Sequence, residues 1–415
     1  MSEGQEFISF TERHLPYETF DADNHMYENR DALTKFIPKE YEGIIKYVEV
    51  NGRTKVAIRD MISDYIPNPT FGRVAVPGGF GQDVTKGGDG SFKAGGVTGV
   101  RVQAMPGLDA FFDPEPRLEL MKSMGIDRTI LWPTLASVVE ERVADDPDAA
   151  CVIIHALNEW MHEHWGYVYA DAIFATPIIT LARLDKALEE LETIHDRGAR
   201  IFLVRVAPVP TWKGRRSFAL PEFDPFWERV QELDLVVGMH SGDPGYTRYT
   251  NEWEGLGNRE FRAFSGNGSP GFLALASEKS PLIDAVASII GHGLTTRFPK
   301  LKFFPVEYPS SWIRPFVTKL RRTYDASPLL FDEDPFEVFA RNIWVHAFHE
   351  PDPKGLIDIG IPVDHIMFGS DFPHPEGMAD PLAYSEIVKD LPEEQQALIM
   401  GGSIAKIMKV GQYAA

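Results

Sequence analysis

The sequence predicts an α/β fold, a (β/α)8 barrel of eight parallel strands and their helices. Strand-like and helix-like segments alternate from Pro114 to the end of the chain. The length of 415 residues suits one elaborated barrel with insertions. Ligand-type side chains also end several predicted strands, which is where such barrels carry their working groups. We therefore expect one domain over residues 1–415.

The elements follow from short apolar runs and longer amphipathic segments. The first strand is expected around Asp21 to His25. Apolar runs that indicate buried parallel strands follow at 127–132, 173–181, 200–206, 235–240, 282–290, 302–307 and 365–368. Helices are expected at 117–124, 148–165, 184–196, 225–232, 312–322 and 392–408. Short apolar runs are common to buried strands and buried helices, so each of these strand assignments depends on the alternation.

Two segments interrupt the alternation. Residues 29–113 are predicted as an insertion or cap after the first strand, with a hairpin at 44–58 that turns at Asn51-Gly52 and then a glycine-rich loop. Residues 241–279 follow the fifth predicted strand. Their aromatic side chains and glycines predict a lid over an apolar or aromatic substrate.

Composition restricts the classes of partner. Lys+Arg 41 against Asp+Glu 61 gives a net charge of −20, which argues against binding nucleic acid. No stretch approaches the roughly 20 apolar residues of a membrane span, and no secretory signal is evident at the N-terminus. A single cysteine, Cys151, excludes an internal disulfide and suits a reducing compartment. We expect a cytoplasmic protein.

Metal-ligand residues recur at the predicted strand ends. Asp23 and His25 occupy alternate positions of the first strand, so they share a face. His240, His292 and Asp371 each follow a later apolar run. Buried, unpaired groups of this kind cost several kcal/mol. Together they predict a site for zinc, iron or manganese.

Four motifs resemble those of the amidohydrolase superfamily, within the branch of aminocarboxymuconate-semialdehyde decarboxylase and resorcylate-type decarboxylases. They are Asp23-Asn24-His25, Met239-His240-Ser241-Gly242, Gly291-His292-Gly293 with Arg297-Phe298-Pro299-Lys300-Leu301, and Phe368-Gly369-Ser370-Asp371-Phe372-Pro373-His374. The likeness spans nearly the whole chain in strand order and implies a metal-dependent TIM barrel. It also implies a homodimer or larger assembly.

The resemblance assigns roles by position. It implies that Asp23, His25, His240 and Asp371 bind the metal, and that Asp371 and His292 take part in catalysis, with His292 as acid/base. This family usually opens with His-x-His, and Asp23 replaces the first histidine.

Glu28 and Glu307 add carboxylates that suggest further ligands, and an oxygen-rich pair of metals favours iron or manganese. We expect one divalent ion per chain, with two as the alternative. The opening also resembles that of a smaller group of barrel proteins that includes a diiron monooxygenase linked to CoA-bound substrates.

Other residues are assigned to substrate binding. Arg215 and Arg216 lie in a basic segment after the fourth predicted strand, where they would attract an anionic group such as a carboxylate or CoA phosphates. Tyr246 in the predicted lid, Trp312 and His374 complete the set. The expected partner is a small, anionic molecule.

Three functions stay open at this point. The leading hypothesis is a metal-dependent hydrolase or non-oxidative decarboxylase that acts on a small carboxylated, aromatic or CoA-linked substrate. The alternative is a nonheme diiron monooxygenase in the same barrel. The third is a barrel that binds a ligand without catalysis and carries no metal.

Overall fold

The structure is a computed structural model. It describes residues 4–50, 53–59, 61–62, 71–79, 91–93, 101–245, 253, 255, 280–308, 310–347 and 352–414. Strands and helices alternate through most of this part of the chain, so the general α/β pattern predicted from the sequence is confirmed.

Eight strands run parallel to their neighbours. They are β1 (Phe20–Met26), β8 (Arg128–Pro133), β10 (Ile173–Ala175), β11 (Ile201–Leu203), β14 (Val236–His240), β15 (Lys302–Val306), β16 (Val345–His346) and β17 (Ile366–Met367). A short strand, β9 (Val168–Tyr169), pairs antiparallel with β10.

Isolated parallel bridges connect the sheets that these strands form. The ladders themselves make three groups, β1-β8-β10, β11-β14-β15 and β16-β17. Bridges Ile178↔Leu203 and Phe303↔Ile343 link the groups in sequence, and Asn24↔Phe372 returns from the segment after β17 to β1. The ladders of the described residues do not form one continuous closed sheet. The bridges nevertheless place the strands in chain order with the last beside the first.

Apolar side chains pack on both faces of the strands. One cluster joins residues of β1, β8, β10, β11, β14, β15 and β17, and Ile404 and Met408 of the last helix pack against it. A larger cluster joins the other strand faces to the helices. Trp132 lies in the first cluster, and its indole N–H donates to the carbonyl oxygen of Ala22 at 3.0 Å. Strands covered on both faces explain why the sequence shows continuous apolar runs.

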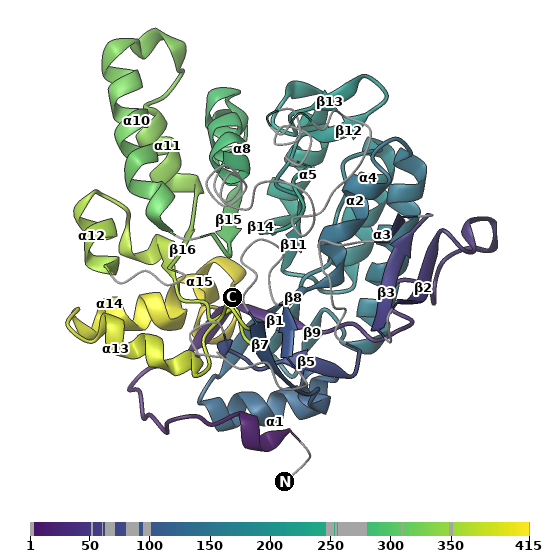
Figure 1. Cartoon of the computed structure of the whole chain (residues 1–415). Coiled ribbons are helices and arrows are strands. Elements are labelled where there is room, and N and C mark those ends of the chain that lie inside the picture. Colours follow the sequence, from purple (N-terminus) through teal and green to yellow (C-terminus); the bar gives the residue numbers. More distant parts are fainter. Residues whose placement is uncertain are drawn as a thin grey trace.

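The main helices are α1 (Pro114–Met124), α2 (Val139–Arg142), α3 (Pro147–His164), α4 (Leu184–Asp196), α5 (Asp224–Leu233), α8 (Ser280–Gly291), α9 (Leu294–Arg297), α10 (Ile313–Ala326), α11 (Pro335–Asn342), α12 (Pro353–Asp358), α13 (Ser385–Val388), α14 (Glu393–Ala397) and α15 (Ser403–Met408). They lie outside the strands, with α10 and α11 on one side and α3 and α4 on the other (Figure 1). Helix α3 begins where the Asp146 side chain accepts a hydrogen bond from the N–H of Ala149, and Pro147 follows that cap.

The sixth strand differs from the sequence prediction. The run 282–290 is part of helix α8, because its buried residues Leu282, Val286 and Ile289 recur at helical spacing. Strand β15 is therefore the sixth in order. The seventh is β16, a strand of two residues that the sequence analysis missed.

The two interrupting segments are described to different extents. Within 29–113, β2 (Ile45–Val50) and β3 (Arg53–Ile58) form the predicted hairpin, joined by β4 (Met61–Ile62). The prediction of a loop after this hairpin is wrong in part. There β7 (Arg101–Pro106) pairs antiparallel with β5 (Arg73–Ala75) and with β6 (Ser91–Lys93). Most of 241–279, including Tyr246, lies outside the described residues.

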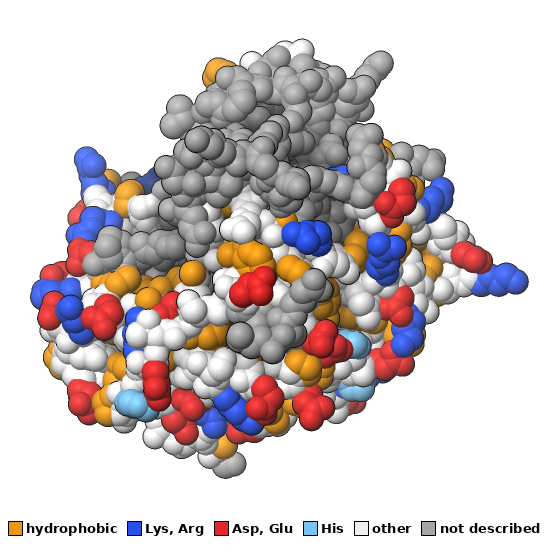
Figure 2. Space-filling model, turned by 60° about the horizontal axis from the view of Figure 1, so that its bottom comes forward, with side chains coloured by type: hydrophobic (Ala, Val, Ile, Leu, Met, Phe, Trp, Pro, Cys, Tyr) orange, Lys and Arg blue, Asp and Glu red, His pale blue; other side chains and the backbone are white. Residues whose placement is uncertain are grey.

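Two global features bear on partners. In the described part of the chain, no helix combines the length and the apolar character that crossing a membrane requires. On the face shown in Figure 2, Lys and Arg side chains are interspersed with Asp and Glu side chains.

Candidate metal centre

Side chains from four strand ends converge on Nε2 of His25. That nitrogen lies 3.1 Å from His240 Nε2 and 3.3 Å from Asp371 Oδ1. Asp23 Oδ1 lies 3.5 Å away and Glu307 Oε2 3.8 Å away. The structure thus brings together the four residues that the sequence suggested as ligands by position, and Glu307, which the sequence analysis named as a further candidate ligand, lies beside them.

The strand geometry explains this convergence. Asp23 and His25 both lie on β1, whose pairing with β8 shifts register between Asp21 and Asn24. His240 is the last residue of β14, and Glu307 directly follows β15, the strand beside it. Asp371 follows β17, and its N–H donates to the carbonyl oxygen of Asp23 at 2.7 Å. Parallel strands carry these carboxyl-terminal residues to one rim.

The donor atoms fit a divalent cation. Two overlapping groups, Asp23–His25–His240 and His25–Glu307–Asp371–His374, each hold ligand atoms within 4.8 Å of one another. In the described part of the chain, neither carboxylate oxygen of Asp23 has a hydrogen-bond partner, and Oδ2 of Asp371 has none either. Buried carboxylate oxygens without partners are costly, and a cation would compensate them. These observations support a divalent metal.

Hydrogen bonds set the histidine tautomers at this centre. Nδ1 of His240 lies 2.8 Å from the carbonyl oxygen of Ser241, so it carries the proton and leaves Nε2 as the ligand atom. The N–H of Glu307 donates to Nδ1 of His346 at 3.0 Å. That contact holds Glu307 in a left-handed backbone conformation, with φ 59°. His346, on the missed strand β16, thereby orients Glu307.

Burial and neighbouring charges move the pKa values of the acidic groups apart. Burial raises the pKa of Glu307 well above its ordinary value, and the charge of Asp371 adds to this. Burial likewise raises the pKa of Asp371, assisted by the charge of Asp23. Burial alone would raise the pKa of Asp23, but the adjacent imidazoles of His240, His25 and His346 outweigh it and lower that pKa. Three adjoining carboxylates therefore do not all ionise without a cation.

Burial and neighbouring charges also move the pKa values of two histidines. Burial lowers the pKa of His25 well below its ordinary value, and the charge of His374 lowers it further. Burial alone would lower the pKa of His240, but the charges of Glu307 and Asp23 raise it. His25 therefore favours the neutral form in which an imidazole binds metal.

Supporting contacts hold β1 in place beneath the centre. Asp21 accepts hydrogen bonds from the N–H groups of Asp23 at 3.1 Å and Ser370 at 2.9 Å. Burial raises the pKa of Asp21 to about 6, although these bonds oppose the rise. The buried Arg117 of α1 donates to the carbonyl oxygen of His25 at 2.5 Å and to the side chain of Asn24. Such contacts around a metal centre fix the ligand orientations.

His374 lies against the centre. Its Nδ1 is 2.7 Å from Asp371 Oδ1, and its ring centroid is 3.8 Å from that of His25. Nε2 of His374 lies 3.3 Å from the Thr134 hydroxyl. The sequence analysis assigned His374 to substrate binding, and its contacts with Asp371 and His25 suit that role or the transfer of a proton.

Two predicted residues lie elsewhere. His292 is exposed after the end of α8, where its Nδ1 lies 3.0 Å from the Ser288 hydroxyl. Its expected position at a strand end is wrong because the preceding run is a helix. Trp312 is buried before α10 and packs on Phe316 and Phe339.

Three further predicted residues have other partners. Glu28 is buried beside the centre, where its Oε1 accepts from the N–H of Leu135 at 2.8 Å, and it belongs to neither ligand group. Arg215 pairs with Glu141 at 2.9 Å, and Arg216 pairs with Glu222 at 2.9 Å. The expected basic segment is therefore largely compensated by acids.

Comparisons with known proteins agree with this geometry. The family model described as Amidohydrolase matches residues 111–409, more than half of the chain. The chain belongs to the amidohydrolase family. The resemblance inferred from its motifs is thus confirmed. An amidohydrolase of Mycobacterium avium subsp. paratuberculosis K-10 has 31% sequence identity and a TM-score of 0.83, over 95% of this chain and 100% of that one.

Two decarboxylase structures share the fold. One is the dihydroxybenzoic acid decarboxylase of Polaromonas sp. JS666 with bound manganese and the inhibitor 2-nitroresorcinol, with 18% identity and a TM-score of 0.53 over 74% of this chain and 90% of that one. The other is the 5-carboxyvanillate decarboxylase LigW of Sphingomonas paucimobilis, with 18% identity and a TM-score of 0.54 over 73% and 85%. No curated protein matches the sequence.

These findings establish the general class. Amidohydrolase relatives imply the TIM-barrel fold for this chain, with mixed helices and strands. Family membership supports an enzyme of the metal-dependent hydrolase and decarboxylase group, and the grouped His and Asp donors support a divalent metal.

Proposed function

We propose that this amidohydrolase is a metal-dependent hydrolase or non-oxidative decarboxylase that acts on a small carboxylated aromatic molecule. The observation that carries the proposal is the convergence of Asp23, His240, Glu307 and Asp371 around Nε2 of His25. The proposal takes the eight strands as a (β/α)8 barrel, with residues 29–113 and 241–279 as a cap and a lid at its mouth.

The chain supplies the ligands and the groups that handle protons. His25, His240, Asp23, Asp371 and Glu307 would hold the ion. When bound, a divalent metal supplies Lewis acidity toward a substrate oxygen or a bound water. Nδ1 of His374 lies within hydrogen-bond distance of Asp371 Oδ1, so this pair could deliver or accept a proton beside the ion. The exposed position of His292 gives that residue no part in this step.

Two supports favour a carboxylated aromatic substrate. A dihydroxybenzoic acid decarboxylase and a 5-carboxyvanillate decarboxylase share the fold. The three acidic ligands also form a harder, more oxygen-rich set than a histidine cluster, which favours manganese or iron over zinc. A CoA-linked substrate has less support, because acids pair with Arg215 and Arg216.

Metal content and turnover of His240→Ala test the proposal. We expect the wild type to hold about one metal ion per chain by elemental analysis, and to convert 2,6-dihydroxybenzoate or 5-carboxyvanillate with release of CO2, or an ester or amide relative with hydrolysis. His240→Ala should lose both metal and turnover. His14→Ala, which changes an exposed histidine that belongs to neither ligand group, is the control. Full activity of a metal-free His240→Ala protein would overturn the proposal.

A second candidate is a nonheme diiron monooxygenase. The second group of possible ligands favours this candidate. It consists of Glu307, Asp371, His374 and His25, and His25 also belongs to the first group. This candidate requires two irons per chain and consumption of O2 with substrate. A single manganese or zinc ion per chain excludes it.

A further inference from the structure

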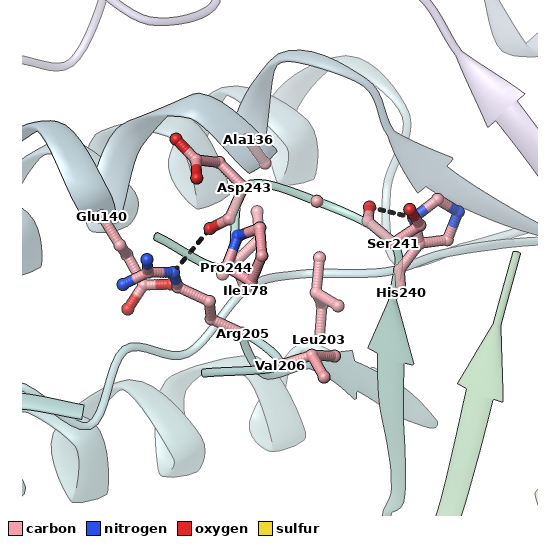
Figure 3. Close-up of a pocket in the computed structure, with 11 residues that line it drawn as sticks. Ala136, Glu140, Ile178, Leu203, Arg205, Val206, His240, Ser241, Asp243 and Pro244 are labelled. Carbon is pink, nitrogen blue, oxygen red and sulfur yellow. Dashed lines mark hydrogen bonds between the residues drawn. The ribbon is translucent and has the colours of Figure 1, made fainter. Parts of the chain in front are cut away.

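The turn that follows β8 lies beside the metal centre. Thr134 directly follows β8, whose last residue pairs with Met26 at the end of β1. Two residues later, Ala136 lines a small pocket together with the candidate ligand His240 (Figure 3). Thr134 itself belongs to neither group of possible metal ligands, so its place at this rim calls for another explanation.

The side chain of Thr134 joins two segments at the rim. Its hydroxyl oxygen lies 2.9 Å from the carbonyl oxygen of Met26 and 3.3 Å from Nε2 of His374. Met26 is the last residue of β1, and His374 lies three residues after Asp371. One hydroxyl group therefore contacts both the first strand and the segment that follows the last strand.

The first of these contacts sets the direction of the second. A hydroxyl group has one proton to donate, and its oxygen accepts through two lone pairs. The carbonyl oxygen of Met26 only accepts, so the proton of Thr134 is directed to it. The hydroxyl oxygen is then an acceptor toward His374, and the imidazole must donate from Nε2.

The other nitrogen of the ring faces a carboxylate. Nδ1 of His374 lies 2.7 Å from Oδ1 of Asp371. A ring that is held at both nitrogens cannot turn about its Cβ–Cγ bond without breaking both contacts. The ring of His25 also lies against it, with the centroids 3.8 Å apart and the planes tilted by 32°. The Thr134 hydroxyl therefore selects both the orientation of the ring and the nitrogen that carries the proton.

A proton on Nε2 suits either use of Nδ1. In the neutral imidazole it leaves the lone pair of Nδ1 directed at Asp371, where a proton of the reaction would be taken up. A histidine that binds metal through one nitrogen likewise donates from the other to a nearby acceptor. The contribution of Thr134 is the same in both cases.

We propose that Thr134 is a positioning residue of this site, which holds the ring of His374 with a proton on Nε2 and with Nδ1 toward Asp371. The inference rests on the proposed function, which gives His374 and Asp371 the transfer of a proton. A merely structural Thr134 would hold β8 against β1 through Met26 and would leave the protons of His374 unchanged.

NMR spectroscopy of the full-length protein with 15N-labelled histidine tests the hydrogen bond directly. Zn2+ is added as the metal, because its filled d shell leaves nearby signals sharp. His374→Gln assigns the signal of His374 by its loss. We expect a proton on Nε2 in the wild type and in Thr134→Ser. In Thr134→Val, which keeps the shape and removes the acceptor, this proton should exchange with water at least about fivefold faster or leave Nε2 altogether.

Turnover by the Mn2+-loaded protein measures the consequence. Thr134→Val should lower kcat at least about tenfold at unchanged metal content, while KM stays within about threefold of the wild-type value. Thr134→Ser restores the hydroxyl and should recover most of kcat. Thr318→Val, which removes an exposed hydroxyl that donates to the carbonyl oxygen of Arg314, is the matched control and should leave both parameters unchanged.

The outcomes separate this inference from the proposed function. If the wild type lacks a proton on Nε2 of His374, or if Thr134→Val keeps the wild-type exchange rate, the positioning role is overturned alone. If the wild type converts none of the substrates named above, the proposed function fails, and the NMR comparison still decides the contact between Thr134 and His374. Thr134→Ala removes the same hydroxyl and takes the place of Thr134→Val if that variant does not fold.

Discussion

Glu307 and His240 meet across neighbouring strands, with Oε2 of Glu307 3.0 Å from Nε2 of His240. β14 and β15 pair in register up to His240 and Val306, so the next residue, Glu307, projects toward the same rim. A left-handed backbone at Glu307 and its N–H bond to His346 hold this orientation. Glu307 is the third carboxylate of the centre. It follows the sixth strand of the structure, a position that the sequence analysis had given to His292.

Glu307→Gln tests whether this carboxylate is a metal ligand. The variant keeps the shape and removes the charge, so we expect affinity for Mn2+ to fall at least about tenfold, measured by competition with a fluorescent chelator. Glu222→Gln, which removes a surface acid paired with Arg216, should bind Mn2+ as the wild type does. Equal affinities in the wild type and Glu307→Gln would remove Glu307 from the ligand set.

The parts of the centre that could be predicted from sequence have a common origin. Asp23 and His25 follow from strand alternation, and His240 and Asp371 follow from clear apolar strands that end at polar residues. In each case the local sequence is enough to predict the face or the end of the strand at which the side chain lies. The resemblance of the motifs to those of the family then suggested these residues as candidate ligands.

The other parts depend on contacts between distant segments. The run 282–290 is apolar enough for either a strand or a helix, so its misassignment shifted the numbering of the later strands and gave His292 a place it does not hold. Strand β16 has only two residues and leaves no periodic signal. The Thr134–His374 contact joins residues that follow different strands, and no local pattern marks it.

Gly238→Ala should destabilise the fold through overpacking. A Cβ at Gly238 would lie 2.3 Å from Cη2 and 2.6 Å from Cζ3 of Trp132, whose ring is fully buried. We expect a loss of roughly 1–3 kcal/mol in the free energy of unfolding, measured by urea denaturation. Gly291→Ala is the control, since a Cβ there meets nothing within 4 Å, and its stability should equal or slightly exceed that of the wild type. Equal unfolding midpoints for the two variants would contradict this packing argument.

Glu28→Gln should change how stability depends on pH. Burial raises the pKa of Glu28 from 4.5 to about 7, although the N–H of Leu135 opposes the rise. Between these values the folded state binds more protons than the unfolded state, so stability falls as pH rises through this window and stays lower above it. The cost at pH 8 is about 3 kcal/mol.

Urea denaturation of the metal-free protein from pH 4 to pH 8 measures this effect. Glu28→Gln keeps an acceptor for the Leu135 N–H and removes the ionisation, so its stability relative to the wild type should increase across the window. Glu119→Gln, at an exposed position of α1, should follow the wild-type profile. A constant difference between Glu28→Gln and the wild type at all pH values would refute the raised pKa.

Cys151 should be nearly inert in the folded protein. It is the single cysteine of the chain, and burial raises the pKa of its thiol to about 12, with the charges of Glu140 and Asp148 adding to the rise. Because the thiolate is the reactive form, modification by a disulfide reagent at pH 8 should be roughly a thousandfold slower in the folded protein than in urea. The unfolded protein, with one rapidly reacting thiol per chain, is the internal control. A folded-state rate within tenfold of the unfolded rate would show that α3 leaves this thiol open to solvent.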